Sequence, residues 1–224
     1  SIDLCLTDPP YETEAHTLQR RVQRGKGELV NMPLPFDSIT EEERKFIAEQ
    51  TSRLLSRGWS ITFCQIEAAM IWRDAYVAHG LKYKRACIYR KSDGMPQYSG
   101  DRPGMGYETL VTMWHGGGRS QWNGGGKHGV YPSQKHIYDY IKGAELDAWR
   151  KSHERHPTEK PIGLMKELVR DFSNEGDIIL DPFMGTGATM VAALHLGRLG
   201  IGIEREKRWV DIAIKRLLQE PLFV

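Results

Sequence analysis

Short apolar runs alternate along this chain with segments of helical periodicity, and this alternation restricts the possible folds more than any other feature. The runs at 2–7, 59–64 and 177–181 have the length of buried strands and end at loop-forming residues. The segments between them carry apolar residues three and four positions apart, as a helix with one buried face requires. This order predicts an α/β fold with an open, mostly parallel sheet and helices on both faces.

Capping residues and chain breakers set the limits of the expected elements. Ser38 or Thr40 followed by three glutamates predicts a helix start, and Gly58 and Gly80 predict helix ends. Helices are expected at 41–55, 67–79, 161–172, 188–196 and 206–218, a further strand at 200–204, and an antiparallel pair of strands at 81–89 and 110–114. The second helix is expected to bury one face, made of Ala68, Ile71, Trp72 and Ala75.

Regular periodicity is weakest between residues 92 and 157, where glycines and polar aromatic residues dominate. A stretch of this length is typical of a functional or mobile loop region. We therefore predict a single catalytic domain over 1–224, in which 92–157 is a loop-rich insertion and the candidate target-recognition region. The chain opens at Ser1 inside a strand-like run, so further sequence upstream is expected.

The composition of the 224 residues is that of a globular protein, with 40% hydrophobic and 27% charged residues. No apolar run has the roughly 18 residues that a membrane span needs, and the start does not resemble a secretory signal, so a cytoplasmic location is expected. Cys5, Cys64 and Cys87 are scattered in strand-like runs and are expected to be reduced thiols of the core, without a metal site. The net charge of +2 does not by itself indicate a nucleic-acid-binding protein.

A glycine turn follows the strand expected at 177–181, in the sequence Asp181-Pro182-Phe183-Met184-Gly185-Thr186-Gly187. Gly185 and Gly187 allow the backbone to approach a ligand closely at a helix N-terminus. Glu204 follows at the end of the next strand, at the spacing of an acidic residue that binds ribose hydroxyls. The pattern indicates a nucleoside cofactor, although a tight strand-to-helix connection without a ligand also accounts for it.

A rigid loop, Asp8-Pro9-Pro10-Tyr11, follows the first strand. The prolines fix their own φ angles and lack N–H groups, so the loop presents mainly carbonyl acceptors. A carboxylate and carbonyls beside an aromatic ring suit a planar group that bears an NH₂. A proline-rich turn with a capping aspartate remains the alternative.

Together the two motifs resemble those of the β-class DNA amino-methyltransferases, in which the Asp-Pro-Pro-Tyr motif precedes the Phe-x-Gly-x-Gly motif. The resemblance implies a Rossmann-like, S-adenosylmethionine-dependent methyltransferase fold with a circularly permuted motif order. It assigns cofactor binding to Asp181, Phe183, Gly185, Thr186, Gly187 and Glu204. The segment His156-Pro157-Thr158-Glu159-Lys160-Pro161 resembles the part that contacts the methionine end of the cofactor, where Lys160 is expected to steer the carboxylate.

The resemblance further implies catalysis by Asp8, Pro9, Pro10 and Tyr11. Asp8 and the Pro9 carbonyl would accept the two amine hydrogens of a base flipped out of double-stranded DNA, and Tyr11 would stack on that base. The aspartate favours adenine N6 as the methylated position. Cytosine N4, an RNA or protein amine, and a non-catalytic DNA-binding relic of the fold remain open, as do a homodimer and a cognate restriction endonuclease.

DNA contacts are expected from the polar stretch 92–135. Arg102, Arg119, Lys127 and His128 are candidates for phosphate contacts, and Trp122 or Tyr107 for filling the gap left by the flipped base. A flexible loop without DNA contacts is the alternative for this stretch. Two further basic clusters, which include Arg20, Arg21, Arg24 and Lys26, are equally compatible with a solvated surface.

Overall fold

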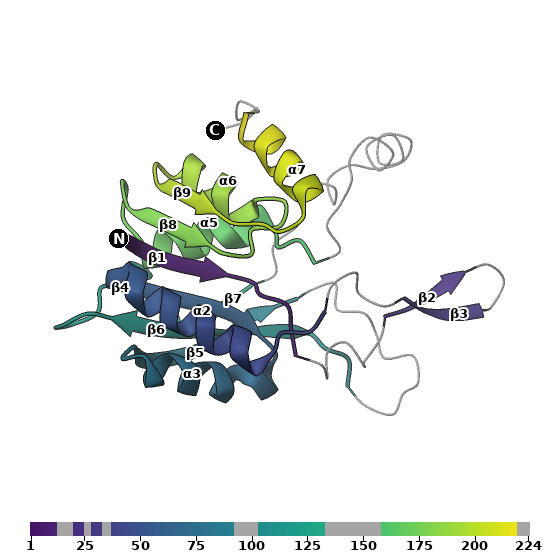
Figure 1. Ribbon diagram of the computed structural model, residues 1–224, viewed down its shortest axis with the longest axis horizontal. Helices are drawn as coiled ribbons and strands as arrows, with labels where there is room; N and C mark the ends of the chain where they lie inside the picture. Colours follow the sequence, from purple (N-terminus) through teal and green to yellow (C-terminus); the bar gives the residue numbers. More distant parts are fainter. Residues whose placement is uncertain (13–19, 25–27, 33–36, 92–102, 133–157, 219–224) are drawn as a thin grey trace.

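The computed structural model describes residues 1–12, 20–24, 28–32, 37–91, 103–132 and 158–218. Its main sheet has seven strands in the order β7-β5-β6-β4-β1-β8-β9 (Figure 1). The strands are β1 (Ile2–Thr7), β4 (Leu55–Cys64), β5 (Lys82–Arg90), β6 (Tyr107–His115), β7 (Val130–Tyr131), β8 (Ile178–Asp181) and β9 (Leu199–Gly202). Only β6 of this sheet is antiparallel to its neighbours. The mostly parallel α/β sheet predicted from the sequence is confirmed.

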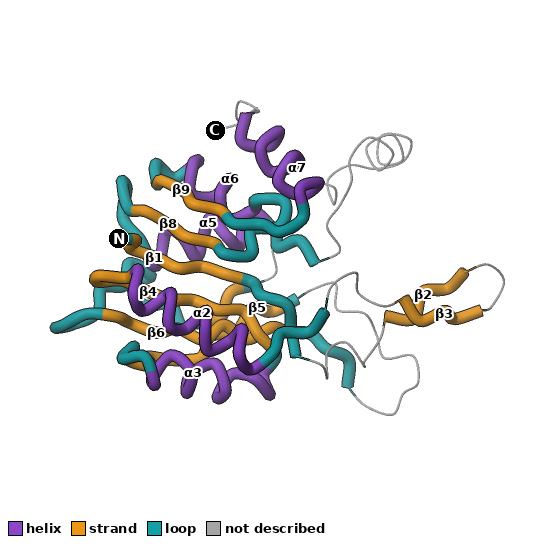
Figure 2. The backbone as a smooth tube through the Cα atoms, in the orientation of Figure 1, coloured by secondary structure: helices purple, strands orange, loops and turns teal. Residues whose placement is uncertain are grey.

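Helices cover both faces of this sheet (Figure 2). One face carries α2 (Glu41–Leu54) and, after the short 3₁₀ helix η1 (Ile66–Ala68), α3 (Ala69–Ala78). The other face carries α5 (Ile162–Phe172) and α6 (Ala188–His195), and α7 (Lys207–Leu218) packs against α6. The side chain of Thr40 caps α2 in a reciprocal capping box with Glu43, as the sequence predicts for this helix start.

Two apolar cores result, one on each face of the sheet. Along β1, Leu4 and Leu6 are fully buried in the core that contains α5 and α6. Cys5, on the alternate side of the strand, belongs to the core beneath α2 and α3. All three cysteines are free and buried, so the prediction that they are thiols of the core is confirmed.

The structure differs from the sequence prediction in several elements. Gly58, predicted to end the first helix, lies within β4, which begins directly after α2. Ile71 is 49% exposed, whereas Trp72 and Tyr76 are the large side chains that α3 buries. A hairpin of β2 (Arg20–Arg24) and β3 (Glu28–Met32) occupies a region without a strand prediction. The two-residue strand β7 is equally absent from the prediction, because its backbone pairing with β5 leaves no periodic signal in so short a segment.

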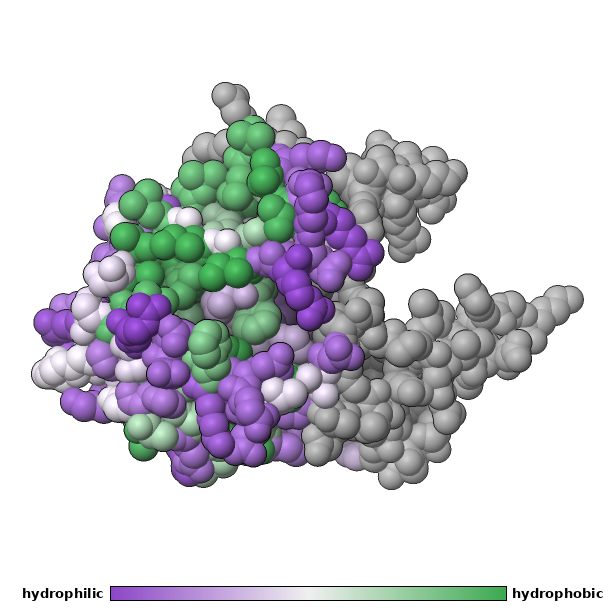
Figure 3. Space-filling view, in the orientation of Figure 1, coloured by the Kyte–Doolittle hydropathy of each residue, from purple (hydrophilic) through white to green (hydrophobic). Residues whose placement is uncertain are grey.

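The edge strand β9 exposes apolar side chains. Leu199, Ile201 and Ile203 are 61%, 47% and 55% exposed, and they alternate along the chain on one side. Figure 3 shows hydrophobic surface in the area where Figure 1 places β8 and β9. Among the described residues, no helix is long and apolar enough to cross a membrane.

Candidate active site

The two motif loops leave the sheet from neighbouring strand ends. β1 and β8 pair in parallel, with Leu4 opposite Ile179 and Cys5 opposite Leu180. The carboxyl ends of parallel strands lie at one edge of a sheet, where ligands bind in open α/β folds. The loop that begins at Asp8 and the turn that follows Asp181 therefore share this edge, which will be called the carboxyl edge.

Asp8 is tied to Lys160 through one of its two carboxylate oxygens. The Lys160 Nζ donates to Asp8 Oδ2 over 2.5 Å, across 152 positions of sequence. Asp8 Oδ1 is buried and has no hydrogen-bond partner among the described residues. Burial raises the pKa of Asp8, and the charge of Lys160 only partly offsets this effect. Among the described residues, this oxygen is thus a buried acceptor without a donor.

Lys160 lies between two carboxylates and two aromatic rings. Its Nζ is 3.3 Å from Glu108 Oε2, and it lies 5.0 Å and 5.7 Å from the ring centroids of Phe63 and Tyr11. Burial lowers the pKa of Lys160, but Asp8 and Glu108 outweigh it, so the net shift is upward. The ammonium predicted to steer a cofactor carboxylate is therefore engaged with Asp8 and Glu108.

Glu108 and Lys91 extend this arrangement into a chain of alternating charges. Glu108 stands near the start of β6 and forms a second ion pair with Lys91, which follows β5. Burial raises the pKa of Glu108, yet the charges of Lys160 and Lys91 bring its net shift downward. Neither residue belongs to a recognisable motif, and only the antiparallel course of β6 brings Glu108 to the carboxyl edge.

The proline loop is anchored at its aromatic end. Pro9 is buried, and the carbonyl of Tyr11 accepts a hydrogen bond of 3.2 Å from the Ile39 N–H. Burial, followed by the charges of Glu108 and Asp8, raises the pKa of the Tyr11 phenol well above its usual value, so the phenol remains neutral. The ring of Tyr11 is thus uncharged and lies 5.7 Å from the Lys160 Nζ that binds Asp8.

Asp181 shapes the glycine turn from within. Its Oδ1 accepts from the Phe183 N–H at 3.1 Å and its Oδ2 from the Thr189 hydroxyl at 2.5 Å. Burial raises the pKa of Asp181 to about 7, and these hydrogen bonds reduce the effect. Gly187 has a φ of 80°, and a Cβ there would lie 2.9 Å from the Cβ of Ala213 in α7. Glycine is required at Gly187 by both conformation and packing.

Glu204, which follows β9, is hydrogen-bonded to the glycine turn. Its Oε2 accepts from the Gly185 N–H at 3.0 Å and its Oε1 from the Glu206 N–H at 2.8 Å. The carboxylate is therefore fixed beside the turn, where the sequence predicts a ribose contact. Phe183 is partly buried and packs against the core on the α2 and α3 side.

A further ion pair, for which the sequence gives no signal, joins three segments behind the turn. The Thr186 hydroxyl donates to Glu159 Oε2 at 2.9 Å. Arg216 of α7 donates to Glu159 Oε1 at 2.9 Å and to the carbonyl oxygen of Thr186 at 3.0 Å. The donors and acceptors at this edge, a carboxylate at a glycine turn and a free acceptor opposite, fit a nucleoside cofactor beside an amine substrate.

Comparison with known proteins decides the family. A model of the family described as DNA methylase matches residues 2–215 of the chain. The chain belongs to this family. The methylase family uses S-adenosylmethionine as its methyl donor, and the predictions of the family, the fold and the cofactor are confirmed.

Two Haemophilus enzymes are among the relatives of this methylase. It is 29% identical to the type II methyltransferase M.HinfI of Haemophilus influenzae over 244 residues, which cover 97% of this chain and 63% of the relative. It is 44% identical to the type II methyltransferase M.HpaI of Haemophilus parainfluenzae over 70 residues, 31% of this chain and 22% of the relative. The methylase chain thus spans less than two thirds of the length of either relative.

Solved structures share the methylase fold. The complex of M1.HpyAVI with S-adenosylmethionine has a TM-score of 0.71 at 24% identity and covers 98% of this chain and 90% of its own. The cytosine-N4-specific PvuII DNA methyltransferase has a TM-score of 0.68 at 15% identity, covering 100% and 82%. At these identities the likeness concerns the fold.

The residues predicted to contact DNA do not gather at the carboxyl edge. His115, at the end of β6, lies opposite Gly58 near the start of β4, so the segment that follows it begins at the other edge of the sheet. Arg119 and Trp122 line an open cleft at that edge together with Arg57. Arg119 and Trp122 therefore lie at the opposite end of the strands from Asp8.

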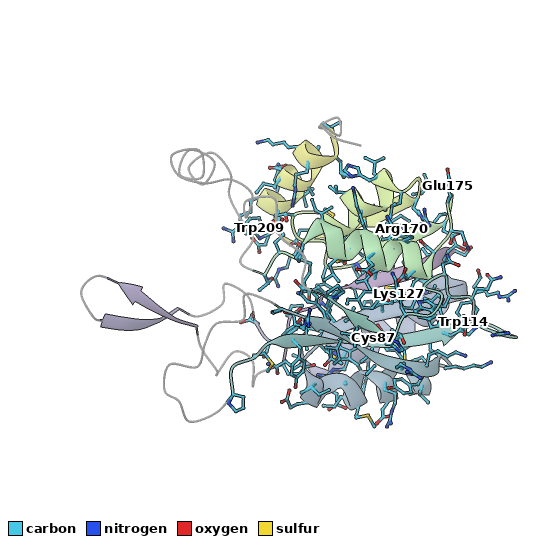
Figure 4. The ribbon with its side chains drawn as sticks, turned by 180° about the vertical axis from the view of Figure 1, so that it is seen from behind. Cys87, Trp114, Lys127, Arg170, Glu175 and Trp209 are labelled. Carbon is cyan, nitrogen blue, oxygen red and sulfur yellow. The ribbon has the colours of Figure 1, made fainter. Side chains whose placement is uncertain are left out.

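The other residues predicted to contact DNA lie in different places along the chain. Lys127 forms ion pairs with Glu167 at 3.0 Å and Asp171 at 2.8 Å and lies against α5 (Figure 4). His128 is exposed just before β7. Arg102 lies outside the described residues, whereas Tyr107, at the start of β6, is at the carboxyl edge and is 37% exposed.

Proposed function

We propose that this methylase transfers a methyl group from S-adenosylmethionine to the N6 amine of adenine in double-stranded DNA. The observation that carries the proposal is the buried, unpartnered Oδ1 of Asp8 at the edge where the glycine turn also lies. The similarity to two type II methyltransferases supports DNA as the substrate. The aspartate that opens the loop supports adenine over cytosine.

Asp8 acts on the amine by accepting a hydrogen bond from it. The lone pair of an exocyclic amine is delocalised into the base ring, which makes the nitrogen a poor nucleophile. Asp8 Oδ1 accepts one N–H and the carbonyl of Pro9 accepts the other, which favours a pyramidal nitrogen with a localised lone pair. The loop holds both acceptors in place before the substrate arrives, so positioning and charge placement provide the catalysis.

The glycine turn holds the cofactor in this proposal. Glu204 accepts hydrogen bonds from the ribose hydroxyls, Gly185 and Gly187 let the backbone approach, and Phe183 packs beside the nucleoside. Asp181 and Thr186 maintain the turn through their hydrogen bonds. When bound, S-adenosylmethionine supplies an electrophilic methyl group on its sulfonium.

Partners and location follow from the proposed substrate. The base must leave the duplex to reach Asp8, and the neutral ring of Tyr11 offers a stacking surface for it. The relatives are type II methyltransferases, which is compatible with the expected cognate restriction endonuclease. A homodimer and a cytoplasmic location stay predictions from the sequence.

The methylated nucleoside tests the proposal directly. DNA incubated with the protein and S-adenosylmethionine is digested to nucleosides, and the methylated product is identified by mass and chromatography. We expect N6-methyladenosine in its deoxy form. N4-methylcytosine would overturn the choice of base, and methylation of RNA or protein alone would overturn the choice of DNA.

The Asp8→Ala variant tests the role of the carboxylate. We expect loss of at least about a thousandfold in turnover with little change in cofactor affinity, because the free acceptor acts only on the substrate amine. Asp74→Ala removes an exposed acid on α3 and serves as the matched control. An Asp8→Ala protein that methylates DNA at the normal rate would contradict the mechanism.

A further inference from the structure

Glu108 has no role in the mechanism described so far, yet it is one of the few carboxylates buried in the structure. It is 9% exposed and stands at the start of β6, one position after Tyr107. Its two cationic neighbours come from different segments, Lys91 from the end of β5 and Lys160 from the segment before α5. Burying a carboxylate and two cations costs free energy of desolvation, which is offset only while both ion pairs are formed.

We propose that Glu108 is a positioning residue of the methyl transfer, which holds the Lys160 ammonium so that Asp8 keeps Oδ2 bound and Oδ1 free for the substrate amine. The inference rests on the proposed function, since it concerns the orientation of the catalytic carboxylate. Glu108 acts only through Lys160 and is not itself placed on the substrate.

The geometry of the ammonium carries the argument. An ammonium has three donors on a flexible stem, so a single acceptor fixes its distance but not its direction. Lys160 Nζ donates to Asp8 Oδ2 at 2.5 Å and forms an ion pair of 3.3 Å with Glu108 Oε2. The centroid of the Phe63 ring lies 5.0 Å from the same Nζ atom. With these neighbours, Lys160 is held in one position relative to Asp8.

Charge balance explains why a second acid is needed. Lys91 neutralises Glu108, and Lys160 lies between Glu108 and Asp8, so the four groups carry no net charge. Without Glu108 the ammonium would be free to centre itself on the Asp8 carboxylate and contact both oxygens. Asp8 would then lose the free acceptor that the reaction needs.

The groups that face Asp8 determine what a titration should show. They are Lys160 from the segment before α5, Glu108 of β6, Lys91 after β5, Asp181 at the end of β8, Tyr11 of the same loop and Cys64 of β4. The charge of Glu108 raises the pKa of Asp8, and the charges of Lys160 and Lys91 lower it. Removing Glu108 and removing Lys160 should therefore shift this pKa in opposite directions.

The test measures the pKa of Asp8 in the full chain without cofactor or DNA. Protein labelled with ¹³C at the aspartate carboxyls is titrated by NMR, and the Asp8 signal is assigned with Asp8→Asn. We expect Glu108→Gln to lower the pKa of Asp8 and Lys160→Met to raise it. Glu67→Gln, an exposed acid in η1, serves as the control and should leave the pKa unchanged.

Kinetics provide the second readout. Glu108→Gln should reduce kcat on the order of tenfold to a hundredfold while the KM for S-adenosylmethionine changes little, because orientation at the reacting amine is lost. The acid limb of the pH–rate profile should move to lower pH in Glu108→Gln. Glu108→Asp keeps the charge and should restore part of kcat, and it replaces Glu108→Gln if that variant fails to fold.

Two outcomes would overturn the inference. One is a pKa of Asp8 that does not respond to Glu108, or that moves in the same direction in both variants. The other is a kcat in Glu108→Gln equal to that of the original chain. The titration requires no turnover, so failure of the proposed methyl transfer would be recognised separately, by the absence of a methylated nucleoside.

Discussion

Two aspartates that end neighbouring strands have different tasks, although both open a motif in the sequence. Asp8 keeps one oxygen free and pairs the other with Lys160. Asp181 uses both oxygens inside its own turn, with the Phe183 N–H and the Thr189 hydroxyl. The hydrogen-bond partners, which the sequence does not display, thus leave an acceptor open on Asp8 and use both oxygens of Asp181 to shape the backbone.

The buried carboxyl of Asp181 should make stability depend on pH. Its pKa is about 7 in the folded chain against a usual value of 3.8, so the unfolded chain loses the proton first as pH rises. The free energy of unfolding should therefore fall between about pH 4 and pH 7, by up to about 4 kcal/mol. Asp181→Asn keeps the hydrogen-bonding shape and should lack this loss.

Urea unfolding of Asp181→Asn and the original chain from pH 4 to pH 8 measures the difference. The two free energies should diverge as pH rises, with the variant the more stable at pH 8. Asp211→Asn, at an exposed acid of α7, is the control and should follow the original chain. Parallel curves for Asp181→Asn and the original chain would refute the shift.

At the scale of elements, α7 is predictable as a helix, but its contact with the glycine turn is not. Amphipathic periodicity shows the helix, whose Trp209 and Ala213 are buried. Its position depends on the close approach of Ala213 to Gly187 and on the ion pair of Arg216 with Glu159. Neither contact has a signal in the local sequence, because each joins segments that are far apart along the chain.

Arg216→Gln should loosen the cofactor turn. The side chain of Glu159 is 13% exposed, and without Arg216 its carboxylate loses the ion pair that compensates its burial. We expect the Kd for S-adenosylmethionine to rise about tenfold, which corresponds to about 1.4 kcal/mol. Isothermal titration calorimetry measures this change.

Lys215→Gln, at an exposed neighbouring position of α7, is the matched control and should bind the cofactor normally. If the ion pair is responsible, the double variant Glu159→Gln/Arg216→Gln should bind more tightly than the sum of the single losses predicts. Unchanged affinity in Arg216→Gln would show that α7 does not support the turn.

For the whole molecule, the question is which edge of the sheet meets DNA. The chain leaves the carboxyl edge after Glu12 and is back there at Ile39, whose N–H binds the Tyr11 carbonyl. Figure 1 shows the hairpin β2–β3, which lies between these points of the sequence, beyond the carboxyl end of β1. The hairpin sequence includes Arg20, Arg21 and Arg24, whereas Arg119 is at the opposite edge.

Replacing the three hairpin arginines with glutamine should weaken DNA binding and its dependence on salt. Each lost phosphate contact lowers the slope of log Kd against log salt concentration by about one, so a decrease of up to about three is expected. Fluorescence anisotropy with a DNA duplex at several salt concentrations measures it. Arg119→Gln is the comparison variant and should bind the DNA duplex with normal affinity. If Arg119→Gln binds DNA more weakly and the hairpin variant binds it normally, the DNA lies at the other edge of the sheet.

The local sequence determined the helices, most strands of the main sheet, the capping box at Thr40 and the two motif loops, because periodicity, caps and turn residues act over a few neighbouring positions. Only the tertiary structure decided which distant groups meet. Lys160 reaches Asp8 across 152 positions, and Glu108 joins them because β6 runs antiparallel in the sheet. Such contacts depend on the order of the strands and on how the helices pack on the sheet. The free energy that stabilises them arises only in the assembled sheet and not within any one segment.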